Sequence, residues 1–169
     1  MVDQPTKKTK VFLSLGSNID PEENLQYACK ELKKTFGNIQ VSSVYRNKSI
    51  GFEGNDFLNM VVKVKSTFSP SEMLDFLGRV ESATGRDIGT GVFDSRTLDI
   101  DMILYNDLVR LEKPFKIPRK DIELYSFVLL PLAEIAPDDI HPVTGKTFKD
   151  LWENFDQEEH PLKKVSLDI

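Results

Sequence analysis

The order in which extended and helical patterns follow one another between Val11 and Tyr105 constrains the fold more than any other feature of this sequence. Runs of β-branched and other apolar residues predict strands at 11–15, 39–46, 57–65 and 97–105. Between them, apolar residues recur at helical spacing in two segments, 21–36 and 70–84. The resulting order is strand, helix, strand, strand, helix, strand.

This element order predicts an α+β fold with a ferredoxin-like βαββαβ core. In such a core the sheet is mainly antiparallel and the first two helices pack on one of its faces. Later apolar segments predict a buried helix at 126–135 and a short one around 148–152, which should extend the sheet or cover its other side. We therefore expect a single α/β/α layered domain over residues 1–169, with flexible ends at 1–9 and 157–169.

Both core helices begin with the same signals. Asp20 and Ser69 stand at the cap positions, a proline follows each of them, and a glutamate stands three positions after each cap. The pattern predicts a capping box at both helix starts. Cys29, the only cysteine, falls on the buried stripe of the first helix and is predicted to be a core residue.

Charge and composition argue against several classes of function. The chain has 22 Lys and Arg against 27 Asp and Glu, a formal net charge of −5, whereas binding to nucleic acid or to a membrane surface favours a basic face. His141 and His160 are the only histidines, which argues against histidine-based zinc sites and Ser-His-Asp chemistry. Since no signal-peptide or transmembrane pattern is visible, we expect a cytoplasmic location.

The predicted strand at 97–105 carries the most informative polar residues. Asp99 and Asp101 share one face of this strand, about 6.5 to 7 Å apart, while Leu98 and Ile100 point the other way. Carboxylates this close repel one another unless a cation or a donor compensates them, and a hard divalent cation such as Mg²⁺ suits both. The alternative is an edge strand with a solvated acidic face.

Two arginines flank the loop before this strand. Arg86 and Arg96 stand on either side of a segment that contains Gly89 and Gly91, and a guanidinium is a planar fork suited to phosphate. Metal, arginine and loop closure are the parts that phosphoryl transfer requires. Because the chain has no P-loop and no protein-kinase signature, these residues indicate a different nucleotide-using family.

The predicted strand at 57–65 offers a candidate site for a flat ring. Phe57 and Asn59 share one face, and an aromatic ring beside an amide suits a heterocycle that needs stacking and edge recognition. Equally compatible with these two positions is the alternative that Phe57 is a core residue and Asn59 an ordinary polar residue of the sheet. The preceding loop, 47–56, contains two glycines and is predicted to be a mobile lid.

Three motifs resemble the 6-hydroxymethyl-7,8-dihydropterin pyrophosphokinase family. They are Arg96–Asp101 (RTLDID), Ser42–Arg46 (SSVYR) and Phe57–Asn59 (FLN), and the similarity extends from Val11 to Pro137. The resemblance implies an enzyme of folate biosynthesis that transfers pyrophosphate from ATP to the hydroxymethyl group of a dihydropterin, leaving AMP. It also implies ATP as co-substrate, two Mg²⁺ ions and small-molecule partners only, and we expect a monomer.

The resemblance further implies roles for the matched positions on the phosphate side. Asp99 and Asp101 would hold the two Mg²⁺ ions, which bridge the ATP phosphates. Arg86 and Arg96 would stabilise charge on the transferred group. The implied nucleotide-binding positions are Glu81, Arg86, Arg96, Arg119 and Lys120.

On the pterin side, the resemblance implies that Phe57 and Phe127 sandwich the ring, with Asn59 bonding its edge. The implied contacts from the neighbouring loop are Asn47, Lys48 and Ile50.

The chain departs from the family pattern mainly on the nucleotide side. Arg119 and Lys120 follow Pro118 where the family commonly has a histidine and then a tyrosine, or another ring or basic residue. Tyr125 stands where an arginine is usual. Further departures, in the loop before Arg96, are Ile88, Val92, Phe93 and Asp94. Two alternatives therefore stay open. One is a diverged pterin-binding or regulatory homologue with weak or no catalysis, and the other is an interaction module of the same fold whose acidic strand face binds a cation.

Overall fold

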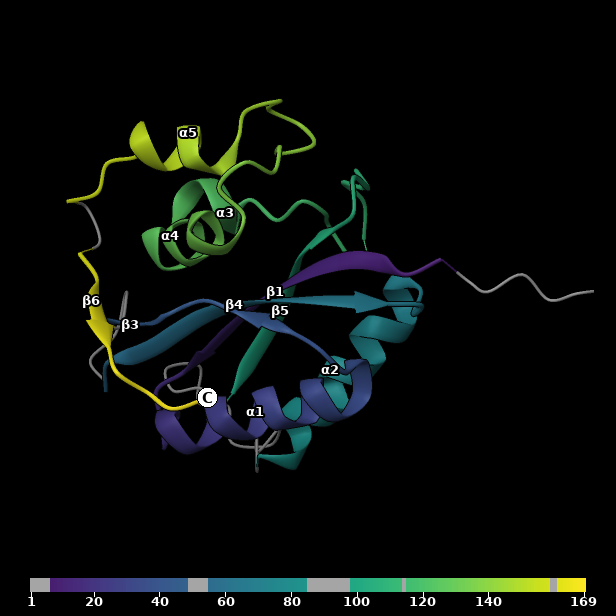
Figure 1. The fold of residues 1–169 in the computed structure, drawn as a ribbon, viewed down its shortest axis with the longest axis vertical. Coiled ribbons are helices and arrows are strands. Elements are labelled where there is room, and N and C mark those ends of the chain that lie inside the picture. The colour runs from purple at the N-terminus through teal and green to yellow at the C-terminus, as the bar shows by residue number, and fades with distance from the viewer. Residues whose placement is uncertain (1–6, 49–54, 85–97, 114, 159–160) are drawn as a thin grey trace, which may run out of the picture.

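The computed structural model describes residues 7–48, 55–84, 98–113, 115–158 and 161–169. In these ranges a sheet lies between two layers of helices (Figure 1). The elements in chain order are β1 (Thr9–Ser17), α1 (Pro21–Phe36), β2 (Gln40–Val41), β3 (Val44–Asn47), β4 (Phe57–Ser66), α2 (Pro70–Ala83), β5 (Asp99–Tyr105), α3 (Asp121–Leu124), α4 (Ser126–Ile135), α5 (Phe148–Glu153) and β6 (Lys163–Val165). Within the same ranges, no helix combines the length and the apolar character needed to cross a membrane.

The sheet has the topology that the element order predicts. Its strands follow the order β5-β1-β4-β3-β6, and β2 also pairs with β4. Every pairing between the described strands is antiparallel. The predicted βαββαβ core with a mainly antiparallel sheet is therefore confirmed, with β1 paired on its two sides to β4 and β5.

One predicted strand is divided in two. Residues 39–46 contain β2 and the start of β3, and both strands pair with β4. Between them, Ser42 N donates to Val61 O at 2.9 Å, while Ser42 Oγ accepts from Val61 N at 2.9 Å. The serine hydroxyl replaces a backbone carbonyl in the ladder, a substitution that short hydroxyl side chains commonly make.

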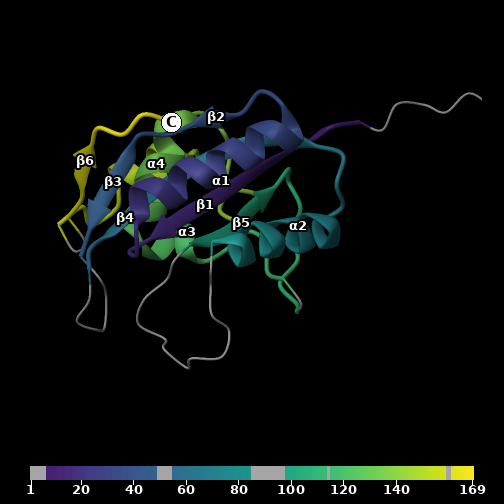
Figure 2. The same ribbon diagram turned by 90° about the horizontal axis from the view of Figure 1, so that it is seen from below.

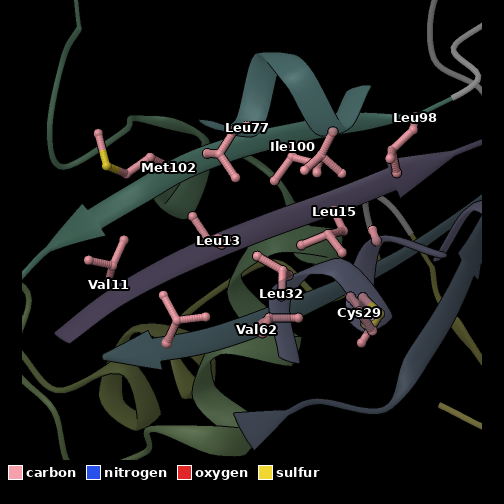
Figure 3. Close-up of a cluster of buried hydrophobic side chains, with 14 of the residues drawn as sticks. Val11, Leu13, Leu15, Cys29, Leu32, Val62, Leu77, Leu98, Ile100 and Met102 are labelled. Carbon is pink, nitrogen blue, oxygen red and sulfur yellow. Dashed lines mark hydrogen bonds between the residues drawn. The ribbon is translucent and has the colours of Figure 1, made fainter. Parts of the chain in front are cut away.

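The core beneath the sheet follows the predicted alternation of faces. Helices α1 and α2 lie side by side on this face (Figures 1 and 2). Figure 3 shows Leu13 of β1 and Ile100 of β5 facing Leu77 of α2, all of them buried. Cys29 of α1 lies in the same core, as predicted, and burial raises the pKa of its thiol to about 12. The thiol therefore stays protonated near neutral pH.

The two helix starts differ. The capping box at Ser69 is confirmed, because Ser69 Oγ accepts from Glu72 N at 3.2 Å and Glu72 Oε1 accepts from Ser69 N at 2.9 Å. The predicted box at Asp20 is wrong, because Asp20 adopts a left-handed conformation with φ 45° and its side chain makes no capping hydrogen bond. A capping side chain normally requires an extended backbone at that position.

Helices α3, α4 and α5 cover the opposite face of the sheet (Figure 1). Val128 and Leu132 of α4 pack in a second core with Phe12 and Val61 from the sheet. The pairing of β1 with β5 shifts register between Phe12 and Leu13, so that Ile103 and Leu104 both belong to this core. Helices on both faces produce the predicted α/β/α layers.

The C-terminal segment contributes to the sheet. Lys163–Val165 form β6 and pair with β3 at the edge of the sheet (Figure 1). Beyond it, Gln26 Nε2 donates to Asp168 O at 2.9 Å, and Leu167 and Ile169 pack against the core beneath the sheet. At the other end, Thr9 already belongs to β1.

Candidate active site

A cavity of about 310 Å³ opens on the face of the sheet that α3 and α4 cover. The strand register explains which side chains meet there, because directly paired residues project from the same face. Gly16 of β1 pairs with Asn59 of β4 and with Asp99 of β5, and Ser14 pairs with Asp101. The described residues that line the cavity are Ser14, Gly16, Asn47, Phe57, Asn59, Asp99, Asp101, Asp121, Tyr125, Phe127 and Val128.

Two aromatic rings from distant parts of the chain line this cavity. Phe57 begins β4, whereas Phe127 lies in the first turn of α4, and both are half-buried. The ring of Tyr125 stacks on Phe127, with centroids 5.0 Å apart and planes inclined by 16°. Tyr125, at a position where the sequence departs from the family pattern, therefore supports the Phe127 ring.

Two asparagines form the polar edge of the cavity. Asn59 Nδ2 donates to Asn47 Oδ1, and Asn47 Nδ2 donates to Lys48 O at 3.0 Å. Both side chains are buried, with 4% of Asn59 and 6% of Asn47 exposed. These bonds hold the two amides in fixed orientations, which recognition of a ligand edge requires.

Gly16 makes room for the Asn59 amide. A Cβ atom at position 16 would lie 3.0 Å from Asn59 Oδ1 and 4.0 Å from Phe57 Cδ1. The first distance is below an ordinary van der Waals contact, so any side chain at this position would displace the amide. The absence of a side chain at Gly16 is thus part of the shape of the cavity.

Glu134, a carboxylate on α4, connects this helix to β3 by hydrogen bonds. Glu134 accepts hydrogen bonds from Ser43 N at 2.9 Å, from Ser43 Oγ at 2.5 Å and from Tyr45 Oη at 3.0 Å. Burial, together with the hydrogen bond to Glu134, raises the pKa of Tyr45 to about 12, so that its hydroxyl remains a donor. Because β3 also carries Asn47, these bonds set the position of α4 relative to the asparagine pair.

The two predicted carboxylates lie where the strand pattern places them. Asp99 and Asp101 are half-buried and line the same cavity, together with Asp121 of α3. Among the described residues, no group of three acidic, histidine or cysteine side chains could hold a metal ion. Since Mg²⁺ is usually bound by one or two carboxylates together with substrate phosphates and water, the Asp99 and Asp101 pair fits a metal that also contacts a phosphate.

Arg119 lies beside these carboxylates. Its Nη2 is 3.2 Å from Asp121 Oδ1 and its Nη1 is 4.0 Å from Asp101 Oδ1. Burial lowers the pKa of Arg119, but Asp101, Asp121 and, more weakly, Asp99 outweigh this effect and raise it. Lys120 is exposed at the start of α3 and is not among the residues that line the cavity. Only the first of the two adjacent cations therefore meets the carboxylates.

The remaining predicted site residues are less informative. Glu81 is half-buried in the last turn of α2, where its carbonyl oxygen accepts from Thr84 N at 3.2 Å, and Lys48 is exposed after β3. The others lie outside the described ranges: Ile50, Arg86 and Arg96, together with the departures Ile88, Val92, Phe93 and Asp94.

The sequence analysis missed several residues of the cavity. Ser14 and Gly16 alternate with Leu13 and Leu15, and this alternation of small or polar with apolar residues could have located them on the site face. Asp121 offers no comparable signal, because its position depends on how the segment after β5 returns over the sheet.

Fold and cavity together define a ferredoxin-like α+β protein in which one cavity joins two aromatic rings, two asparagine amides and the Asp99 and Asp101 carboxylates. The family model for 7,8-dihydro-6-hydroxymethylpterin-pyrophosphokinase (HPPK) matches residues 12–137. The chain belongs to this family.

Curated relatives agree with the family match. The 2-amino-4-hydroxy-6-hydroxymethyldihydropteridine pyrophosphokinase of Synechocystis sp. is 39% identical over 158 residues, which cover 91% of this chain and 80% of the relative. The protein of the same name from Aquifex aeolicus is 38% identical over 144 residues, which cover 83% of this chain and 88% of the relative.

A solved structure with the same fold is the Plasmodium falciparum HPPK-DHPS wild type with pterin and p-hydroxybenzoate. The TM-score is 0.69 at 17% sequence identity, and the match covers 89% of this chain and 44% of that chain. This chain thus spans less than half the length of that protein, and at this identity the likeness concerns the fold alone.

Proposed function

We propose that the chain transfers pyrophosphate from ATP to the hydroxymethyl group of 6-hydroxymethyl-7,8-dihydropterin, giving AMP and the pterin diphosphate, in folate biosynthesis. The observation that carries this function is a single cavity that joins the Phe57 and Phe127 rings to the Asp99 and Asp101 carboxylates. A ring-binding surface beside a metal-binding one is what transfer of a phosphoryl group to a heterocyclic alcohol requires. Family membership and the names of the relatives support the same reaction.

At the pterin end, Phe57 and Phe127 hold the ring between them and Asn59 pairs with its edge. The hydrogen bond from Asn59 to Asn47 supports this role, because it orients the amide before a ligand arrives. Lys48 and Ile50 add contacts from the loop that follows β3.

At the phosphate end, Asp99 and Asp101 would hold two Mg²⁺ ions. Bound Mg²⁺ neutralises phosphate charge and orients the transferred group. Arg86 and Arg96 stabilise charge that develops during transfer. The nucleotide itself is bound by Glu81, Arg119 and Lys120, and the position of Arg119 beside Asp101 supports its share of this role.

The chain works as a monomer in the cytoplasm, and residues 1–169 form one domain. Light scattering on the purified protein should give the mass of one chain, 19.3 kDa, and twice that mass would contradict it.

The function is tested by separating binding from chemistry. Calorimetry should show magnesium-dependent binding of a non-hydrolysable ATP analogue and binding of the dihydropterin alcohol. Incubation with ATP, Mg²⁺ and the pterin should then produce AMP. Pterin binding without AMP formation would support the diverged homologue instead, and binding of neither ligand would support an interaction module.

Replacing Gly16 with Ala should weaken pterin binding roughly tenfold. Adding a methyl group to a site that is already well packed costs about 1 to 3 kcal/mol, because the neighbouring atoms must move. The new methyl group would lie 3.0 Å from Asn59 Oδ1 and push the amide out of its orientation. The melting temperature should change little, because the lower entropy of the unfolded Ala chain offsets part of the strain. Titrations with the pterin and with the ATP analogue should show a defect for the pterin only.

Gly78 provides a matched control. It lies in α2, and a Cβ at this position would meet no atom within 4 Å. Gly78→Ala should therefore leave pterin binding unchanged and stabilise the helix by about 1 kcal/mol. Equal pterin affinity in the Gly16→Ala and Gly78→Ala proteins would refute the shape argument.

A further inference from the structure

Arg119 is anchored to the strand that carries the proposed metal-binding carboxylates. Its backbone N donates to Ile103 O of β5 at 3.1 Å, which sets the start of its side chain close to Asp101. The guanidinium then approaches Asp121 through Nη2 at 3.2 Å and Asp101 through Nη1 at 4.0 Å. One permanent cation thus serves two carboxylates that line the cavity.

The guanidinium retains unused capacity to donate. Its Nε is buried and has no hydrogen-bond partner among the described residues. Leaving a buried donor unpaired costs free energy, and a guanidinium has five N–H groups arranged to bind anions such as carboxylate and phosphate. The present arrangement therefore does not satisfy Arg119 fully, and an anion that reached its fork would gain hydrogen bonds.

The contact with Asp101 is also the weaker of the two ion pairs. At 4.0 Å it attracts the carboxylate without the short contacts of a bidentate pair, and 39% of the Arg119 side chain is exposed. A divalent ion carries twice the charge and approaches carboxylate oxygens to about 2.1 Å. Such an ion and the Arg119 guanidinium would repel one another at the same carboxylate.

We propose that Arg119 is a built-in counter-cation of Asp101, that divalent metal and Arg119 compete for this carboxylate, and that the displaced guanidinium turns to the phosphates of the nucleotide. This inference rests on the proposed function, since it requires a metal site at Asp101. It makes metal binding without nucleotide weak and links tight metal binding to the arrival of a phosphate partner for Arg119.

Metal binding in the absence of nucleotide tests the competition directly, with Mn²⁺ as the spectroscopic probe. Arg119→Ala should bind Mn²⁺ about three- to tenfold more tightly than the unaltered protein, since removing a partly screened unit charge near 4 Å has an effect of that order. Arg119→Gln, which keeps a polar side chain of similar length, should behave in the same way. Electron paramagnetic resonance of free Mn²⁺ during the titration measures the dissociation constant.

Lys116→Ala is the matched control. Lys116 is an exposed cation on the same connecting segment and does not line the cavity, so the variant loses the same charge outside the site. Its Mn²⁺ affinity should stay within about twofold of the unaltered protein, as expected for a screened surface charge. If Lys116→Ala and Arg119→Ala gained the same Mn²⁺ affinity, the effect would come from net charge alone, and the proposal would be overturned.

The second experiment measures the affinity for the ATP analogue at saturating Mg²⁺. Under this condition the competition between metal and Arg119 for Asp101 no longer limits binding. Arg119→Ala should now bind the analogue about tenfold more weakly, because charge-assisted hydrogen bonds to phosphate are lost. Tighter Mn²⁺ binding together with weaker analogue binding in Arg119→Ala is the result expected if Arg119 exchanges Asp101 for phosphate. Unchanged or weaker Mn²⁺ binding in Arg119→Ala, or unchanged analogue binding, would overturn the proposal.

Asp101→Asn separates failure of this inference from failure of the proposed function. If the unaltered protein binds Mn²⁺ and Asp101→Asn does not, the metal site exists, and the Arg119 variants decide the inference alone. If both proteins bind Mn²⁺ with the same measurable affinity, Asp101 is no metal ligand, and the metal role and the Arg119 exchange fall together.

Discussion

Replacing Asp101 with Asn should leave the protein folded and reduce the rate of AMP formation by about a thousandfold or more. The amide keeps the shape of the side chain and loses the charge that holds Mg²⁺ beside the phosphates. Losing several kcal/mol of metal-dependent transition-state stabilisation corresponds to a rate effect of about this size. Asp99→Asn should have an effect of similar size, because both carboxylates line the same cavity.

The measurement is AMP release under saturating ATP and pterin, accompanied by a melting curve. Asp107→Asn is the control, since Asp107 is an exposed carboxylate in the turn that follows β5 and outside the residues that line the cavity. Its turnover should equal that of the unaltered protein. Near-normal AMP formation in both the Asp99 and the Asp101 variants would show that the metal assignment is wrong.

Replacing Phe127 with Ala should weaken pterin binding by about thirty- to a hundredfold, or 2 to 3 kcal/mol, while binding of the ATP analogue stays unchanged. The ring would lose both its stacking energy and the apolar area it covers on the ligand. Phe57→Ala should give a similar loss, since the two rings line the same cavity from different elements. Calorimetric titration of each ligand separates the two affinities.

Melting curves distinguish a ring clamp from a core role. If Phe127 or Phe57 mainly supported the fold, its replacement would cost about 3 to 5 kcal/mol of stability with no selective binding defect. Phe155→Ala is the matched control, because this ring stacks on Trp152 at a centroid distance of 5.8 Å, and Phe155 does not line the cavity. It should lose stability and keep its pterin affinity.

The core and its elements followed from local patterns in the sequence. The element order predicted the βαββαβ core, since period-two and helical spacing of apolar residues report directly which face each element buries. The capping box at Ser69 was predictable for the same reason, because all its atoms come from residues 69–72. The Asp20 box failed although the residue types matched, because a left-handed backbone at Asp20 removed the required geometry.

Elements that depend on distant partners could not be predicted. Strand β6 is short and polar, and it is ordered through its pairing with β3, far away in sequence. The break between β2 and β3 depends on the bonds of Ser42 to Val61. Neither feature has a local apolar pattern. Strand β6 is held by backbone hydrogen bonds, which any residue type can make, and the break at Ser42 is held by bonds to a residue in another strand.

For the candidate site, the sequence by itself determined that Asp99 and Asp101 share a face, and likewise Phe57 and Asn59. Strand geometry alone requires both. Only the tertiary structure decided that these two faces are one surface, because the register of β1 aligns Gly16 with Asn59 on one side and Asp99 on the other. It also decided that Phe127 faces this surface and that Arg119 pairs with Asp101. Such contacts arise from the packing of segments far apart in the chain, which residue spacing does not encode.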